Sequence, residues 1–145
     1  SKIIKQYTPI LNQQINKYLN RMGFGISFEL DENFDETIKS RYRDEFAYAN
    51  FSEGEKLRID LSILLAFRDI ARMKNSVNTN LLIFDEILDS ALDNDGIEEF
   101  LKIIFGLTEN TNTFIISHRD GINEKFQETY RFTKQRNFTI LKKEE

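Results

Sequence analysis

The sequence contains no cysteine, and its hydrophobic residues form no long continuous run. Without cysteine there are no disulfide bonds and no thiolate metal sites, which agrees with a reducing compartment. No apolar stretch approaches the roughly 20 residues of a membrane-spanning helix, and the N-terminus lacks the apolar region of a signal peptide. We therefore expect a cytoplasmic protein. The net charge of −4 provides no overall attraction to nucleic acid, so a DNA contact would need a local basic patch.

What the chain does contain is typical of a globular domain. Of its 145 residues, 40% are hydrophobic and 30% are charged. A domain of this length buries roughly two-thirds of the surface of its unfolded chain, which is enough for a real core. We expect one domain over residues 1–145.

The most informative segment is residues 81–86, in which four apolar residues are followed directly by Asp85 and Glu86. The apolar part predicts a strand in a sheet covered on both faces, and open α/β sheets bind ligands at the carboxyl ends of their strands. There, one carboxylate can hold Mg²⁺ through its water shell, and the next can orient or deprotonate an attacking water. The alternative interpretation is an ordinary acidic loop after a buried strand.

A second apolar strand is predicted at residues 113–117 and ends at His118. Between the two strands, a turn at 94–96 precedes a helical pattern in which Asp95 and Glu98 have the spacing of a capping box. This strand–helix–strand order predicts parallel strands whose carboxyl ends meet at one edge. A lone histidine is more often structural, but this placement favours a functional role for His118.

Another helix is predicted to open at Ser52 and to end near residues 72–75. Ser52 and Glu55 form a capping-box pattern, and the helix is apolar on most sides, so we expect it to be deeply buried. Capping is the commoner role of such a serine. A helix N-terminus with a hydroxyl and a glycine, here Gly54, is also a ready phosphate site, although the charges of Glu53 and Glu55 would repel phosphate.

The flanking segments predict a helix and two hairpins. Thr8 and Pro9 suggest a helix start and Gly23 a stop. Apolar residues before Pro9 suggest a helical segment arriving from upstream, and an ordinary N-terminal amphipathic helix is equally compatible. Hairpins are expected at 25–39 and 130–142, with a loop or short strand at 40–50.

Four segments together resemble the motifs of ATP-binding-cassette (ABC) ATPases. Residues 51–56 (Phe-Ser-Glu-Gly-Glu-Lys) resemble the signature motif, 81–86 the Walker B motif, 90–93 (Ser-Ala-Leu-Asp) the D-loop, and His118 the switch histidine. All four occur in the family's order, which is far more specific than any one motif. The helix leading in and the short spacing from Walker B to D-loop resemble the SMC and SbcC branch, the coiled-coil ATPases of chromosome maintenance and double-strand-break repair. Within it, the ATPase subunits of phage recombination exonucleases are the suspected relatives.

The resemblance implies an α/β fold: the C-terminal lobe of an ABC-type ATPase head, with parallel core strands, flanking helices and terminal hairpins. Residues 1–23 would be the root of an incoming coiled coil, and residues 24–145 the ATPase lobe. The sequence contains no Gly-x-x-x-x-Gly-Lys-Ser/Thr loop. In this branch that Walker A loop lies in an N-terminal half, beyond the coiled coil. The chain would then be half of a head, with apolar residues exposed where the other half completes the sheet.

The resemblance also implies roles for individual residues and two cofactors, ATP and Mg²⁺. Glu86 would polarise the attacking water, His118 would contact the γ-phosphate, and Asp85 would position Mg²⁺ through water. The signature residues Ser52, Glu53, Gly54, Glu55 and Lys56 would face ATP held by a second head, and Ser90 and Asp93 of the D-loop would lie at that interface. Glu53 stands where the family usually has glycine, so the signature loop is expected to differ in shape.

The implied function is ATP binding and hydrolysis at a head–head interface, driving DNA end processing in recombination and repair. The implied partners are the N-terminal Walker A half of the same polypeptide, a second head in a homodimer, a nuclease subunit and double-stranded DNA. No membrane is implied, and the expected location is the cytosol of a bacterium or a phage-infected host.

Three alternatives remain open. A transporter ATPase shares these motifs, but its Walker A precedes the signature in the same domain, and the 51 residues before Ser52 contain none. A metal-dependent nuclease could use the acids at 85–93 as a two-metal cluster, although such acids usually come from several strands. That cluster would comprise Asp85, Glu86, Asp89 and Asp93. A non-enzymatic lobe could dock DNA or a nuclease through a basic patch, drawn from Arg41, Arg43, Lys56, Arg58, Arg131, Lys134 and Arg136.

Overall fold

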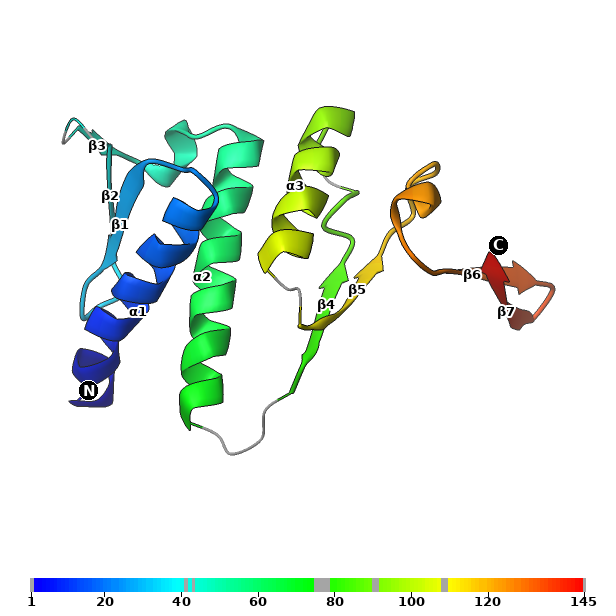
Figure 1. Ribbon diagram of the computed structural model, residues 1–145, viewed down its shortest axis with the longest axis horizontal. Helices are drawn as coiled ribbons and strands as arrows, with labels where there is room; N and C mark the ends of the chain where they lie inside the picture. The colour runs from blue at the N-terminus through cyan, green and yellow to red at the C-terminus, as the bar shows by residue number, and fades with distance from the viewer. Residues whose placement is uncertain are drawn as a thin grey trace.

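The computed structural model describes residues 2–40, 42, 44–74, 79–89, 92–107 and 110–144. Helices and strands alternate along much of the chain, as Figure 1 shows. In order, the elements are α1 (Lys2–Arg21), β1 (Ile26–Leu30), β2 (Glu36–Ser40), β3 (Glu45–Phe46), the 3-10 helix η1 (Tyr48–Asn50), α2 (Glu53–Lys74), β4 (Leu81–Asp85), α3 (Asn94–Leu107), β5 (Asn112–Ile116), the 3-10 helix η2 (Asn123–Lys125), β6 (Thr129–Gln135) and β7 (Phe138–Glu144). The predicted α/β class is confirmed.

Helix α1 starts earlier than predicted. Pro9 does not open the helix but lies inside it, so the apolar residues upstream belong to the same continuous element. A proline in a helix interior removes one hydrogen bond, a loss that packing along α2 offsets (Figure 1). The predicted stop is confirmed. Gly23 has a φ of 67°, and the amides of Gly23 and Phe24 donate to the carbonyls of Asn20 and Leu19.

The first sheet is antiparallel with strand order β1-β2-β3, and α1 covers its open edge. The side-chain amide of Asn16 accepts from the Phe28 amide (2.9 Å) and donates to the Phe28 carbonyl (2.7 Å). Asn12 makes the same pair of bonds to Leu30, at 2.9 Å each. The outward backbone groups of an edge strand are thereby satisfied within the chain.

Helix α2 is buried on one side only. Its buried residues are Ile59, Leu61, Ser62, Leu65 and Ala66, whereas Leu64 and Phe67 are 44% and 46% exposed. The prediction that this helix is deeply buried on most sides is therefore wrong. In this chain α2 lies between α1 and α3, which leave part of its circumference uncovered (Figure 1).

Strands β4 and β5 pair in parallel, as predicted, with Ile83 beside Phe114 and Asp85 beside Ile116. One face of this pair packs on α3, where Phe84 meets Phe100 edge to face at 5.7 Å between ring centroids. The other face is open in this chain, whereas the sequence predicted a strand covered on both faces. Its apolar residues are Leu81 (47% exposed), Ile83 (55%), Phe114 (56%) and Ile116 (48%). Such a face is what the half-head interpretation predicts.

Helix α3 is capped by a different residue from the one predicted. It begins at Asn94, so residues 94–96 form its first turn and Asp95 lies inside it. Asp93 is the cap: its carbonyl accepts from the Ile97 amide (3.0 Å) and its Oδ1 accepts from the Gly96 amide (2.8 Å). Glu98, the other half of the predicted box, instead pairs with Lys125 (2.7 Å). The predicted capping box at Asp95 and Glu98 is wrong, because the helix already starts at Asn94 and Asp93 accepts from the free Gly96 amide of its first turn.

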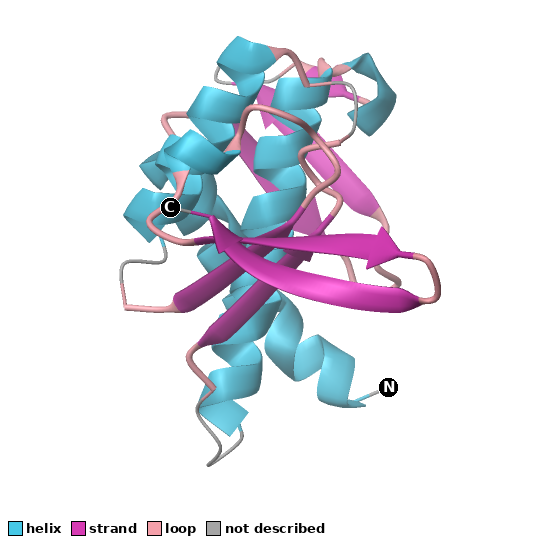
Figure 2. Ribbon diagram, turned by 90° about the vertical axis from the view of Figure 1, so that its right-hand side faces the viewer, coloured by secondary structure: helices cyan, strands magenta, loops and turns pink. Residues whose placement is uncertain are grey.

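The chain ends in the predicted hairpin. Strands β6 and β7 pair antiparallel from Thr129 beside Glu144 to Gln135 beside Phe138. The hairpin lies at the opposite end of the molecule from α1, and Figure 2 views the structure from that end. Within the described ranges, no helix has both the length and the apolar character needed to cross a membrane.

Candidate functional site

The carboxyl ends of β4 and β5 bring Glu86 and His118 together. The Glu86 amide donates to the Ile116 carbonyl (2.8 Å), which joins the two strand ends. Beyond them, Nε2 of His118 lies 3.1 Å from Oε1 of Glu86. The His118 and Glu86 side chains are 80% and 62% exposed, so a ligand can reach both. Asp85, the last residue of β4, is also exposed.

The backbone at Glu86 adopts an unfavourable conformation. Its φ of 55° lies in the left-handed region, which costs a residue other than glycine about 1 kcal/mol. Strain of this kind collects at functional sites, where the surrounding structure holds it in place. Here it turns the chain sharply after β4 and directs the Glu86 carboxylate to the end of β5.

Two residues next to His118 were not identified from the sequence. The Ser117 hydroxyl donates to Asp89 Oδ1, and the His118 amide donates to Asp89 Oδ2 at 2.8 Å. These bonds hold the pKa of the Asp89 carboxyl below its usual range, the Ser117 bond contributing most. The Arg119 guanidinium donates to the Leu92 carbonyl at 2.8 Å. The only signal in the sequence was a run of three polar residues after an apolar strand.

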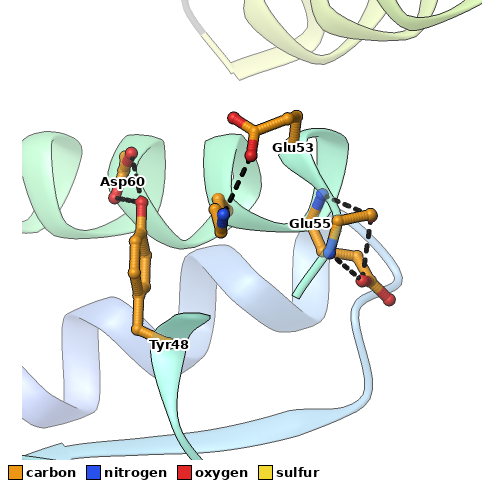
Figure 3. Close-up of polar contacts among 6 residues, drawn as sticks. Tyr48, Glu53, Glu55 and Asp60 are labelled. Atoms are coloured by element: carbon orange, nitrogen blue, oxygen red, sulfur yellow. Dashed lines mark hydrogen bonds and ion pairs between the residues drawn. The ribbon is translucent and has the colours of Figure 1, made fainter. Parts of the chain in front are cut away.

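At the start of α2 the predicted capping box is confirmed (Figure 3). The Glu55 carboxylate accepts from the Ser52 amide and from the Ser52 hydroxyl, both at 2.9 Å. The Glu55 amide approaches Ser52 Oγ at 3.4 Å. A Cβ at Gly54 would meet no atom within 4 Å, so packing inside this chain does not require glycine there. The space next to Gly54 is open to a ligand.

Charges at this helix start are already paired within the chain. Lys56 Nζ lies 2.8 Å from Glu53 Oε1 and 5.9 Å from the centre of the Tyr48 ring. The Tyr48 hydroxyl donates to the Asp60 carboxylate, at 2.9 and 2.8 Å to its two oxygens (Figure 3). Burial and then this hydrogen bond raise the pKa of Tyr48. The Tyr48 contact pins η1 to the first turns of α2.

The predicted site residues thus fall into separate groups. Glu86, His118 and Asp85 lie together at the strand ends, and Ser52 to Lys56 lie together at the start of α2. Among the described residues, no hydrogen bond or ion pair joins these two groups. Asp93 caps α3, and the other D-loop residue, Ser90, lies outside the described residues.

The acids after β4 do not gather as a two-metal nuclease site would require. Over the part of the chain that the structure describes, no group of three or more His, Cys, Asp or Glu side chains could hold a metal ion. Asp89 is engaged by Ser117 and His118, and Asp93 by Gly96. One exposed carboxylate, Asp85, fits Mg²⁺ of the kind that keeps several waters and binds nucleotide phosphates.

Three residues of the possible basic patch are paired with carboxylates. Lys56 pairs with Glu53, Arg58 with Glu99, and Arg131 with Glu144. Arg41 and Arg43 lie outside the described residues. Lys134 and Arg136 belong to the terminal hairpin, at the other end of the molecule from η1 and α2 (Figure 1).

Comparison with known proteins gives relatives over nearly the whole chain. Exonuclease subunit 2 of Escherichia phage RB69 is 47% identical over 139 residues, and that of Enterobacteria phage T4 is 46% identical over 139 residues. Each match covers 96% of this chain and 25% of the relative, so the chain spans about a quarter of the length of these curated relatives. No protein-family model matches the chain.

The solved SMC head domain from Thermotoga maritima has a similar fold, with a TM-score of 0.68. The match covers 99% of this chain and 50% of that structure, at 22% sequence identity.

Proposed function

We propose that this chain, which is the C-terminal lobe of an SMC-like ABC-type ATPase head, supplies the hydrolytic residues of an ATP site shared between two heads. The observation that carries this proposal is the Glu86–His118 pair, 3.1 Å apart at the ends of two adjacent parallel strands and open to solvent. A carboxylate and an imidazole in this arrangement can act on a water molecule and on the γ-phosphate of a nucleotide that is bound next to the strand ends.

Each residue at the strand ends has a distinct role in this proposal. Glu86 orients and polarises the attacking water, and His118 holds Glu86 by its hydrogen bond and contacts the γ-phosphate. Asp85 would hold Mg²⁺ through water, and the ion when bound would neutralise charge on the phosphate oxygens. Glu86 is exposed and unshielded, so its activity depends on a nucleotide and a partner surface that exclude bulk water.

The second group of residues, at the start of α2, acts on the other nucleotide of a dimer. They lie at the start of α2, whereas Glu86, His118 and Asp85 lie at the ends of β4 and β5. The resemblance of residues 51–56 to the signature motif supports a site assembled from two heads rather than one. Ser52, Glu53, Gly54, Glu55 and Lys56 would then face the ATP of the partner head, with Ser90 and Asp93 at the interface. Hydrolysis would require dimerisation.

The open face of β4 and β5 is proposed to receive the other half of the head. An exposed apolar face on the parallel pair β4–β5 is formed by Leu81, Ile83, Phe114 and Ile116. Parallel strands are usually buried on both faces, so this face is expected to be covered. We infer that a lobe carrying the Walker A loop, elsewhere in the same polypeptide, covers it. Residues 1–23 would then be the root of a connecting coiled coil, and 24–145 the ATPase lobe.

The full-length protein is proposed to work with a nuclease on DNA ends. The relatives at 47% and 46% identity are named as subunits of exonucleases, which supports a nuclease partner. Double-stranded DNA is the substrate that we propose for the complex. The site of action would be the cytoplasm of a phage-infected host.

The direct test is ATP hydrolysis by the full-length protein. The rate of ATP hydrolysis should depend on Mg²⁺. It should rise more than in proportion to protein concentration, because two heads share each nucleotide. Asp85→Asn should weaken Mg-dependent nucleotide binding. Turnover that is strictly proportional to protein concentration down to the lowest measurable level would contradict a shared site.

A further inference from the structure

Asp89 joins the turn that follows β4 to the loop that follows β5. Its Oδ2 accepts from the backbone amide of His118 at 2.8 Å, and its Oδ1 accepts from the Ser117 hydroxyl. The Ser117 hydroxyl oxygen in turn accepts from the Arg119 amide at 3.1 Å. One carboxylate therefore fixes the backbone on both sides of the His118 side chain.

The His118 ring depends on this support. The side chain is 80% exposed, so packing does not hold it, and its position follows from the backbone that carries it. Its ring contact with Glu86 is a single hydrogen bond of 3.1 Å. A small shift of the backbone at residue 118 would break that contact, because hydrogen bonds weaken steeply with distance and angle.

Asp89 follows a residue that is anchored in the core. Leu88, directly before it, is fully buried, and the Asp89 amide donates to the Glu86 carbonyl at 3.0 Å. Glu86 and Asp89 therefore belong to one tight turn anchored in the core. When Asp89 fixes the loop of His118, it fixes that loop relative to Glu86.

A second connection comes from Arg119. Its guanidinium donates to the Leu92 carbonyl at 2.8 Å and to Asn94 Oδ1 at 3.1 Å. Leu92 and Asn94 flank Asp93. The loop after β5 is thus tied both to the turn carrying Glu86 and to the residues around the cap of α3.

We propose that Asp89 is a positioning residue for ATP hydrolysis, which holds the His118 loop in register with Glu86 without touching the nucleotide. Together, Asp89 and Arg119 connect the His118 loop to the turn that carries Glu86 and to the residues on either side of Asp93. This inference rests on the proposed function, because it assigns Asp89 an effect only through His118.

The test is a double-mutant cycle in the full-length protein, using Asp89→Ala, His118→Ala and the combination, with kcat and KM for MgATP as readouts. Asp89→Ala should lower kcat roughly 10- to 100-fold with KM unchanged, the cost of a misplaced catalytic group. In the His118→Ala background, Asp89→Ala should add less than about twofold, because the group it positions is gone.

Two further variants separate positioning from folding. Asp89→Asn should recover most of kcat, since its amide oxygen can accept from the His118 amide and its NH₂ group can donate to Ser117. Asp44→Asn, at an exposed aspartate directly before β3, is the matched control and should leave kcat and KM unchanged, because β3 and β5 lie on different sides of the molecule (Figure 1). If Asp89→Ala does not fold, Ser117→Ala removes one of the two bonds and takes its place in the cycle.

The outcomes distinguish this inference from the proposed function. Equal losses in the wild-type and His118→Ala backgrounds, or full kcat in Asp89→Ala, would overturn the positioning role of Asp89 alone. Full turnover in His118→Ala would remove His118 from the proposed reaction, and the role of Asp89 with it.

Discussion

Nε2 of His118 lies 3.1 Å from Oε1 of Glu86, across the ends of two parallel strands that are 32 residues apart in the chain at this point. The contact exists because Ile116 accepts the Glu86 amide and because Asp89 holds the amide of His118. These two bonds thus prearrange a carboxylate and an imidazole before any nucleotide is present. Such prearrangement removes part of the cost of ordering a reactive site.

Neutralising Glu86 should separate ATP binding from hydrolysis. In the full-length protein, Glu86→Gln keeps the shape of the side chain but cannot polarise water, so kcat should fall by on the order of 10² or more while ATP still binds. Glu124→Gln, at an exposed glutamate of η2, is the matched control. Undiminished turnover in Glu86→Gln would exclude Glu86 as the activating base.

Substitutions of Ser52 should separate its capping role from a role at the dimer interface. Ser52→Ala loses the hydroxyl bonds of the capping box and should cost about 1 kcal/mol in the free energy of unfolding. Ser52→Arg places a large side chain at the open helix start and should block ATP-driven dimerisation, measured by sedimentation. If Ser52→Ala is less stable but has normal turnover at saturating protein, Ser52 is a cap only.

The charge of Glu53 should weaken ATP binding across the interface. The Glu53 side chain, which pairs with Lys56, is 63% exposed, so Glu53→Gln should change the unfolding free energy by less than about 1 kcal/mol. Removing a carboxylate near the phosphates should nevertheless lower KM for ATP roughly twofold or more at low salt, with a smaller effect at high salt. Glu53→Asp, which keeps the charge, is the control. An unchanged KM would place Glu53 away from the phosphates.

The contact between α1 and α2 should make stability depend on pH in the alkaline range. The buried Tyr18 hydroxyl donates to Asp69 Oδ2 at 2.6 Å, and burial, followed by this bond, raises the pKa of Tyr18 from 10.0 to about 12. Because the folded state holds the proton more tightly, the stability from this group is complete below pH 10 and is lost as the pH rises to about 12.

Tyr18→Phe tests this linkage. At pH 7 it should cost about 2 kcal/mol in urea unfolding, the typical loss of a hydrogen bond to a charged group. Its difference from the wild type should shrink between pH 10 and pH 12. A difference that stays constant over this range would mean that the Tyr18 proton is not bound more tightly in the folded state.

The core of this site was predictable from local patterns. An apolar run that ends in acids, a helical pattern and a second apolar run predict parallel strands whose polar ends meet, and the Glu86–His118 contact follows. The capping box at Ser52 was predictable for the same reason, since its partners are three residues apart. Where residues close together in the chain fix the geometry, the local sequence is enough to predict it.

The errors arose where neighbouring residues compete or where the partner is distant. Asp93 and Asp95 are both good caps, and only the backbone decides that Asp93 holds the Gly96 amide. The bonds of Asn12 and Asn16 could not be predicted, because the strand edge that they bind lies 12 to 18 residues further on. Asp89 looked like a metal ligand because Ser117 and His118, its actual partners, are almost 30 residues away.

The central claim, a site shared between two heads, is tested most directly by mixing two inactive full-length variants, Glu86→Gln and Ser52→Arg. In a mixed dimer, one site contains both substitutions and the other contains neither. With equal amounts and random pairing, half of the pairs are mixed. Each mixed pair keeps one intact site, whose ATP can still hold the two heads together, so ATP turnover should rise to at most about a quarter of the wild-type value. Turnover no higher than the sum of the two variants measured alone would contradict a site built from Glu86 of one head and Ser52 of the other.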